Sequence, residues 1–431
     1  MASVTVAQQK LVLNAFAAIF QNNLVSKDLV TWNKFEGEMN DRNGLQVIEQ
    51  VAPRYVVTET VNGVKDLTAG VQDSVFGSEI YKIDRTFGAS MGWGDFVKIR
   101  DLGEARESVA LKQAALQMCE AIDKHILNAA SVNSGHWLGT PANGVDQFGD
   151  VVQGYTRLKE LGVVDENIKA VLTYQDKEDL GEAVIDFKAT DQLATGAFRN
   201  GFTGAIGGIP TLFTQQLPTF SNGNDVTGAA VDGADQNVTY AAASASSAPG
   251  RYLTQTLHID GITTGTGTVA TCSVFTIADV YEYDNRAQQS TGKLRQFVVV
   301  SGGTASGTSD IDLVIYPAMI VPGVTDVDTA HATVDSVPAD DAAITFVGAA
   351  DTAYKPRLLL DKNAINVCTA DLIMPASDTS MRKSLSKLPL SVRMWQKSDF
   401  ATGAHSIRFD VALTANVLAG GRDRIVRING N

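Results

Sequence analysis

The longest regular hydrophobic pattern in the chain lies between residues 101 and 132 and has the period of an α-helix. Apolar side chains recur at intervals of three or four residues, at Leu111, Ala115, Met118, Ile122, Ile126 and Ala129. Such a stripe lies on one helix face, and about thirty helical residues are roughly 45 Å long. Asp101 followed by Glu104 resembles a capping box at its start. The pattern predicts a long spine helix over residues 101–133, although an ordinary helix crossing a sheet would show the same stripe.

A second helical pattern lies near the N-terminus, over residues 6–25. Its apolar side includes Leu11, Ala15 and Ile19. The polar stretch that follows offers no obvious core, and a short helix is marginal in water unless its apolar face is buried. We therefore predict that residues 1–50 form an N-terminal arm whose Leu11, Ala15 and Ile19 contact a neighbouring subunit. An ordinary terminal helix is the alternative.

Residues 51–100 combine β-forming runs with regularly spaced glycines. The runs RYVVTETV and EIYKI favour strands, and DFVKI follows a further group of glycines. We predict an extended hairpin that leads into the spine helix. Because an isolated hairpin is marginally stable, its order should come from neighbouring subunits. Trp93, between two glycines, is a candidate for a contact between subunits, and local packing explains it equally well.

The rest of the chain changes from a mixed pattern to a purely β pattern and back. Residues 134–218 predict a central α/β layer, with a helix, a strand and a second helix at 150–161, 168–174 and 175–187. Residues 219–356 contain short β runs between Gly- and Thr-rich turns, which predicts an inserted all-β barrel domain. Residues 357–431 contain longer β runs that should return to the earlier sheets. The predicted fold class is α+β.

Charge and cysteine content narrow the function classes. The chain has 35 Lys and Arg against 48 Asp and Glu, a formal net charge of −13. This balance argues against broad binding to nucleic-acid phosphates. Cys119, Cys272 and Cys368 are far apart and odd in number, so we predict buried, reduced thiols rather than disulfides. No run of roughly eighteen apolar residues occurs, so we predict no membrane-spanning helix.

The titratable residues form no recognisable catalytic or metal-binding pattern. No two of the five histidines have the spacing of a helical metal pair, and no cysteine pair has CxxC spacing. His125 is interpreted as a structural histidine beside the spine stripe. Asp326, Asp328 and His331 could be drawn as a metal cluster, but a solvated acidic loop is the preferred interpretation. We predict no catalytic residue, no cofactor and no metal.

The order of the predicted parts resembles that of a known family. An arm, a glycine-punctuated hairpin, a spine helix and a central α/β layer resemble the major capsid proteins of tailed double-stranded DNA bacteriophages, with the Hong Kong ninety-seven type fold. GAIGGIPTLFTQQLP resembles a turn in their central layer. LRQFVVVSGGTASGTSDIDLVIYP and AAITFVGAADTAYKPRLLLDKNAINVCTADLIMP are similar to the short-tailed Salmonella phage coat protein type, which carries a telokin-like insertion domain. The loop at residues 318–343 departs from that type because it is long and acidic.

The resemblance implies a non-enzymatic subunit that self-assembles in many copies into an icosahedral shell. It implies a separate scaffolding protein and a portal protein as partners, and packaged double-stranded DNA that is enclosed without specific binding. The chain would then be part of the virion capsid and would assemble in the host bacterial cytoplasm. Two other classes stay open: a phage tail, baseplate or cell-surface β protein, and an enzyme whose site has no recognisable motif.

Overall fold

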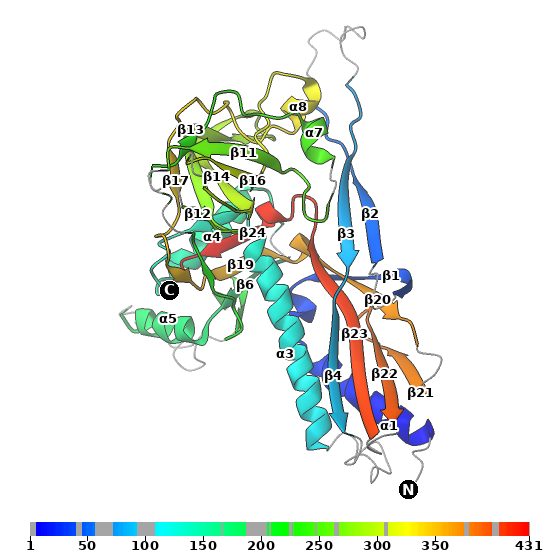
Figure 1. Cartoon of the computed structure of the whole chain (residues 1–431). Helices are drawn as coiled ribbons and strands as arrows, with labels where there is room; N and C mark the ends of the chain where they lie inside the picture. The colour runs from blue at the N-terminus through cyan, green and yellow to red at the C-terminus, as the bar shows by residue number, and fades with distance from the viewer. Residues whose placement is uncertain are drawn as a thin grey trace, which may run out of the picture. The chain divides into compact units, whose positions relative to one another are not determined.

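The computed structural model places helices and strands in two compact units (Figure 1), and the predicted α+β class is confirmed. Unit 1 comprises residues 1–47, 81–129 and 365–416, and unit 2 comprises residues 48–80, 130–364 and 417–431. The structure describes residues 6–39, 45–56, 72–92, 108–164, 167–186, 205–206, 208–223, 226, 228–245, 248–262, 267–305, 309–374, 379–398 and 405–430.

Unit 1 is built on a six-stranded sheet whose strands come from distant parts of the chain. Their order is β1 (Thr31–Met39), β20 (Ile365–Leu372), β23 (His405–Val417), β22 (Ser391–Ser398) and β21 (Thr379–Ser384), and β4 (Thr86–Gly92) also pairs with β23. β1 runs parallel to β20, whereas β21, β22, β23 and β4 pair antiparallel. Part of the predicted N-terminal arm is therefore a strand of this sheet.

The predicted spine helix is present as α3 (Val109–Val132), and its narrow apolar stripe is confirmed. Five of the six stripe residues are buried and Ala129 is half-buried. The predicted capping pair, Asp101 and Glu104, lies outside the described residues. His125 has a structural role, as predicted, because its Nε2 accepts the Ala415 N–H at 3.4 Å and its ring packs against that of Phe87.

The N-terminal helix α1 (Val6–Asn23) packs within its own unit, so the prediction that this segment lacks a core is wrong. The Phe16 ring is fully buried and stacks on that of Phe409 in β23, with ring centroids 4.0 Å apart. Gln9 donates a hydrogen bond of 2.8 Å to Gln396 of β22. The core that covers α1 comes from strands near the other end of the chain, which a local pattern does not reveal.

The predicted hairpin differs from the observed strands. Its two-stranded sheet consists of β2 (Leu45–Val51) and β3 (Gly77–Ile83). The first strand therefore precedes RYVVTETV, of which the described residues 54–56 are not in a strand. β4 joins the unit 1 sheet rather than the hairpin. The remaining hairpin positions, including Trp93 and the run DFVKI, lie outside the described residues.

Unit 2 contains a central six-stranded sheet that carries two helices, α4 (Phe148–Glu160) and α5 (Tyr174–Asp186). The strand order is β5 (His136–Leu138), β24 (Ile425–Ile428), β19 (Arg357–Asp361), β6 (Ile168–Leu172), β8 (Ile209–Phe213) and β7 (Ala205–Ile206). The predicted helix, strand and helix of this layer are confirmed. α4 packs closely on β24, because a Cβ at Gly154 would lie 2.7 Å from Cδ1 of Ile428. A buried ion pair between Asp176 and Arg357 joins α5 to β19.

A second six-stranded sheet lies in residues 219–356, hereafter the β-block. Its order is β10 (Ala230–Val231), β11 (Gln255–Asp260), β16 (Ile311–Tyr316), β14 (Gln289–Ser301), β13 (Val274–Asp284) and β17 (Ile344–Phe346). All of these pairs are antiparallel. Backbone hydrogen bonds also join the segments at the two ends of this sheet, from Val231 N–H to Ala342 O and from Ile344 N–H to Ala229 O.

Several short elements complete the two units. They are β9 (Phe220–Ser221), β12 (Thr268–Val269), β15 (Gly303–Thr304), β18 (Ala353–Tyr354), α7 (Tyr240–Ser244), α8 (Asp326–Ala330), and the 3₁₀ turns η1 (Ser26–Asp28), η4 (Lys362–Ala364) and η5 (Arg422–Arg424). The predicted burial of the three cysteines is confirmed. Burial raises the pKa of the Cys119 thiol to about 12 and also raises that of Cys272.

Because Phe16 is buried against β23, we expect Phe16→Ala to lower the free energy of unfolding of the unassembled subunit by about 3–5 kcal/mol. Asn22→Ala on the exposed side of α1 is the matched control and should change it by less than about 0.5 kcal/mol. Urea unfolding followed by circular dichroism measures both. Equal, small effects of the two substitutions would favour a docking arm over a core helix.

Candidate functional site

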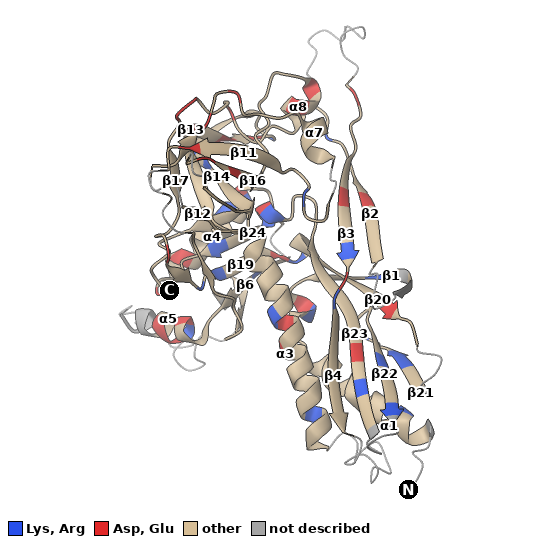
Figure 2. Cartoon of the chain, in the orientation of Figure 1, with Lys and Arg blue, Asp and Glu red and all other residues tan. Residues whose placement is uncertain are grey.

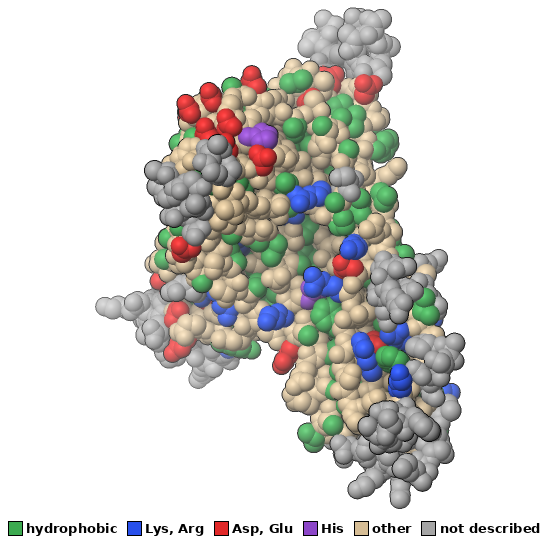
Figure 3. Space-filling model, viewed as in Figure 1, with side chains coloured by type: hydrophobic (Ala, Val, Ile, Leu, Met, Phe, Trp, Pro, Cys, Tyr) green, Lys and Arg blue, Asp and Glu red, His purple; other side chains and the backbone are tan. Residues whose placement is uncertain are grey.

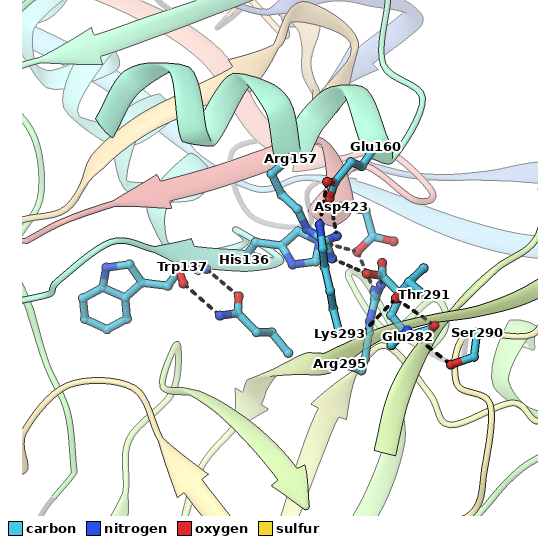
Figure 4. Close-up of polar contacts among 12 residues, drawn as sticks. His136, Trp137, Arg157, Glu160, Glu282, Ser290, Thr291, Lys293, Arg295 and Asp423 are labelled. Atoms are coloured by element: carbon cyan, nitrogen blue, oxygen red, sulfur yellow. Dashed lines mark hydrogen bonds and ion pairs between the residues drawn. The ribbon is translucent and has the colours of Figure 1, made fainter. Parts of the chain in front are cut away.

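A network of charged side chains joins the β-block to the central sheet of unit 2 (Figure 4). At its centre, the buried Arg295 of β14 donates hydrogen bonds to Glu282 of β13 at 2.7 Å and to Asp423 of η5 at 2.8 Å. Arg157 of α4 donates to the other oxygen of Glu282 at 2.7 Å. The two cations therefore share a buried carboxylate between them.

The network continues from the buried centre to the surface. Arg157 also bonds Glu160 at 3.2 Å, and Glu160 in turn pairs with Lys293 of β14. The Lys293 and Glu160 side chains are 60% and 39% exposed, whereas that of Arg295 is 5% exposed. Exposed pairs contribute little to stability, and a buried charge without its partner is costly. The inner contacts of Arg295 therefore matter most.

The cations keep both inner carboxyl groups ionised. Burial alone would raise the pKa of Glu282, but Arg295 and Arg157 outweigh it and lower the pKa. Asp423 is partly exposed. Desolvation acts to raise its pKa, but the charge of Arg295 outweighs this effect and holds the pKa well below the usual range. The attraction is mutual, because these carboxylates raise the pKa of Arg295 despite its burial. The network is therefore charged on both sides well into acidic solution.

His136 of β5 lies beside this network without adding a charge to it. It is fully buried, and burial lowers its pKa, so its ring is neutral at pH 7. Its Nε2 lies 3.5 Å from Asp423, which is too far for a well-formed hydrogen bond. The Tyr316 hydroxyl donates to the other oxygen of Asp423 at 3.2 Å. Asp423, in the turn η5 that directly precedes β24 of the central sheet, is thus held by two groups of the β-block, Arg295 and Tyr316.

A second buried cation, Arg427 of β24, crosses the same boundary. Its guanidinium lies over the rings of Trp137 and Phe220, 5.1 and 4.9 Å from their centroids. It donates to the Cys272 carbonyl of the β-block at 2.8 Å, and burial lowers its pKa to about 10. Stacking on aromatic faces is a favourable setting for arginine. It ties the end of the chain to the β-block.

An open pocket of about 410 Å³ lies next to the network, between α4 and β14. Its lining is mixed, with Leu138, Gln153, Thr156, Arg157, Glu160, Lys293, Leu294 and Gln296. Gln296 bonds both the N–H and the carbonyl of Trp137, which satisfies part of the edge of β5. The charged groups of the pocket, Arg157, Glu160 and Lys293, are paired with one another.

The loop around Asp328 is not the solvated acidic tip that the sequence favoured. Asp326 is exposed, but Asp328 and His331 are buried. Asp328 accepts the Tyr240 N–H at 2.7 Å, and the His331 ring stacks on that of Tyr240. Within the described residues, no group of three or more His, Cys, Asp or Glu side chains is arranged to hold a metal. No helix in that part is both long and apolar enough to cross a bilayer.

The predicted contact residues have different positions in the structure. Ala15 is fully buried inside unit 1, which contradicts its predicted contact with another subunit. Leu11 and Ile19 are half-exposed on α1, and their contact with a neighbouring subunit stays a prediction. Trp93 lies outside the described residues. Of the three described residues, which follow one another at four-residue intervals on α1, only Leu11 and Ile19 are therefore accessible for such a contact.

Sequence reasoning missed the charge network. A usable signal was present, because Arg295 interrupts the apolar run LRQFVVV and Arg427 interrupts RIVRI. A charged residue inside a buried strand requires a partner. Its partners, such as Glu282 and Asp423, come from other strands and turns, so the sequence could indicate that a pair exists without identifying it.

Charge is distributed unevenly between the units (Figure 2). Unit 1 has 17 Lys and Arg against 15 Asp and Glu, whereas unit 2 has 18 against 33. Acidic side chains gather over one end of the β-block in the space-filling view (Figure 3). In the β-block, partial burial together with Asp232, Asp341 and other neighbouring aspartates raises the pKa of Asp260. This surface is unsuited to polyanions.

Comparison with known proteins defines the class of the chain, which is a phage coat protein, a structural protein rather than an enzyme. Residues 89–420 match the family model described as P22 coat protein, gene protein 5, and the chain belongs to this family. It is 22% identical over 233 residues to the major capsid protein of Acyrthosiphon pisum secondary endosymbiont phage 1. That alignment covers 54% of each protein, so the chain spans about half the length of this relative.

Solved structures similar to the chain include phage capsids. The capsid of cyanophage P-SCSP1u has a TM-score of 0.42 and 10% identity, over 94% of this chain and 87% of that one. The mature capsid of bacteriophage PhiM1 has a TM-score of 0.41 and 10% identity, over 93% and 85%. Mycobacterium phage Che8 has a TM-score of 0.39 and 11% identity, over 96% and 89%.

We expect Arg295→Met to lower the free energy of unfolding by about 3–5 kcal/mol, because it leaves the buried Glu282 with Arg157 alone and removes the arginine partner of Asp423. Lys293→Met, two positions away on β14, is the matched control and should change it by no more than about 1 kcal/mol. Denaturant titration of the unassembled subunit at pH 7 measures both. Similar losses for the two variants would mean that the inner pairs contribute no more than the exposed one.

The network also predicts how stability depends on acid. A carboxyl group whose pKa is lower in the folded state stabilises the fold above its unfolded pKa, and this contribution is lost as the pH falls through the folded pKa. For Glu282 and Asp423 the loss begins below about pH 4. We expect Arg295→Met to lose stability less steeply than wild type below that pH, and Lys293→Met to follow wild type. Urea midpoints between about pH 3 and 7 test this, and parallel profiles for wild type and Arg295→Met would contradict it.

Proposed function

We propose that the chain is a major capsid protein whose copies assemble into a closed icosahedral shell around a phage genome. The observation that carries this proposal is the family match over residues 89–420, which covers most of both units. We assign the fold to the Hong Kong ninety-seven type, with α3 as the spine helix and the β2–β3 pair as part of the extended hairpin. The half-exposed Leu11 and Ile19 of α1 are candidates for contacts between subunits.

The β-block fits the role of an inserted, telokin-like domain. The chain leaves the central sheet after β8 and returns to it at β19, and both of these strands pair with β6. Residues 219–356 therefore lie between two strands of one sheet. Their antiparallel strands, the backbone bonds between the two ends of the sheet and an apolar core of their own support a barrel. Arg295 and Arg427 would hold this insertion in one orientation.

The proposed partners are further copies of the chain, a scaffolding protein and a portal protein, with double-stranded DNA enclosed but not specifically bound. The acidic surface of unit 2 supports the last point, because it would repel phosphates rather than retain them. The location that follows is the virion capsid, after assembly in the host cytoplasm.

Assembly of the purified chain tests this proposal. We expect closed particles in negative-stain microscopy and rapid sedimentation when the chain is co-expressed with a scaffolding protein from the same phage. Expression without that protein is the control and should give fewer or irregular particles. Tubes, sheets or persistent monomers in the presence of scaffolding protein would contradict a shell-forming role.

A further inference from the structure

The strand β3 is docked onto the β-block of its own subunit. Ser78 forms a parallel bridge with Ala245, immediately after α7. The approach is close, because a Cβ at Gly77 would lie 2.7 Å from Cε2 of Tyr252 and 3.2 Å from the Tyr240 hydroxyl. The ribbon formed by residues 45–56 and 72–83 therefore has an attachment within the subunit, contrary to the expectation that its order comes only from neighbours.

Glu79 is the charged group at this attachment. Its side chain is buried, and its Oε1 accepts the N–H of Gly250 at 3.3 Å. On the other side of Gly250, the carbonyl accepts from Nη2 of Arg422 at 3.2 Å, and the Arg422 guanidinium lies over the Tyr316 ring. Gly250 thus lies between Glu79 of the ribbon and the buried guanidinium of Arg422 in η5.

We propose that Glu79 is a proton-controlled clasp, which holds the ribbon on the β-block while its carboxyl group is protonated and weakens this attachment when the proton is lost. A neutral carboxyl can remain in this buried place beside the backbone N–H groups of Gly250 and Ile80. A carboxylate there needs more compensation than these two N–H groups and the charge of Arg422 provide. The other titratable group facing it from the β-block, Tyr252, adds no positive charge.

The electrostatics of the site give the direction of the pH dependence. Burial raises the pKa of Glu79 from 4.5 to about 7, and the opposing effects of Gly250 and Arg422 are smaller. The docked form binds the proton more tightly than the undocked form does. Protonation of Glu79 therefore stabilises docking fully below pH 4.5, and this stabilisation declines as the pH rises and is lost above about pH 7. In total, docking should weaken by roughly two orders of magnitude.

A second titratable contact of the ribbon acts in the opposite direction. The N–H of Arg54 donates to Nε2 of His331 at 3.2 Å, which requires a neutral ring. Burial and the charge of Arg54 lower the pKa of His331 from 6.5 to about 4, although Asp328 opposes them. Its contribution to docking is lost as the pH falls through this range. The two effects overlap in wild type, so Glu79 must be isolated by a variant.

Hydrogen exchange in the unassembled subunit tests the clasp. The amides of residues 77–83 are followed by mass spectrometry between pH 5 and 8 in wild type, Glu79→Gln and Glu49→Gln. Glutamine imitates the protonated acid at every pH. Each variant is compared with wild type at the same pH, so that the pH dependence of intrinsic amide exchange and the effect of His331 titration are the same in both. Glu49 is exposed on β2 and supplies the control. We expect Glu79→Gln to differ from wild type by only about a few-fold near pH 5 and to be roughly a hundredfold better protected at pH 8.

Three outcomes would overturn the proposal. They are a protection ratio between Glu79→Gln and wild type that stays constant with pH, lower protection of Glu79→Gln at every pH, or the same change in Glu49→Gln. If Glu79→Gln does not fold, Glu79→Met provides a second uncharged side chain for the same profile. The measurement uses the free subunit, so its result does not depend on whether the chain forms shells.

Discussion

The need to neutralise charge away from water is the constraint on which unit 2 depends. Arg295, Glu282 and Arg157 are removed from solvent together, and each would cost several kcal/mol if left alone. They come from β14, β13 and α4, so the charges balance only when the β-block is seated on the central sheet in one way. Apolar contacts alone would tolerate small rotations of these layers, whereas paired charges with directional bonds do not. The network therefore favours one orientation of the β-block on the central sheet.

The parts of the fold that sequence could predict are those whose evidence is local. The stripe from Leu111 to Ile126 repeats every turn and is buried as a whole, so it identified α3 without knowledge of its partners. α1 shows the same kind of pattern, but the element that buries its apolar face includes Phe409, which is about four hundred residues away in the sequence. Periodicity indicates that a face is buried and does not reveal which element buries it.

The hairpin and the charge network show the same limit in strands. The described start of RYVVTETV, residues 54–56, is not in a strand despite its β propensity, whereas β3 pairs with β2, because strand formation depends on pairing as well as on propensity. For the network, Arg295 within an apolar run indicated a buried cation. Its partners Glu282 and Asp423 could not be chosen from among 48 acidic residues, because the choice depends on the tertiary fold.

The three buried thiols have a practical consequence for following this protein. Cys119 and Cys368 belong to unit 1 and Cys272 to unit 2, and burial disfavours the reactive thiolate at Cys119 and Cys272 through their raised pKa values. A small alkylating reagent can therefore modify each of them only after the surrounding unit has opened. Peptide mapping of the modified cysteines at successive times would follow the opening of each unit separately, without any introduced label.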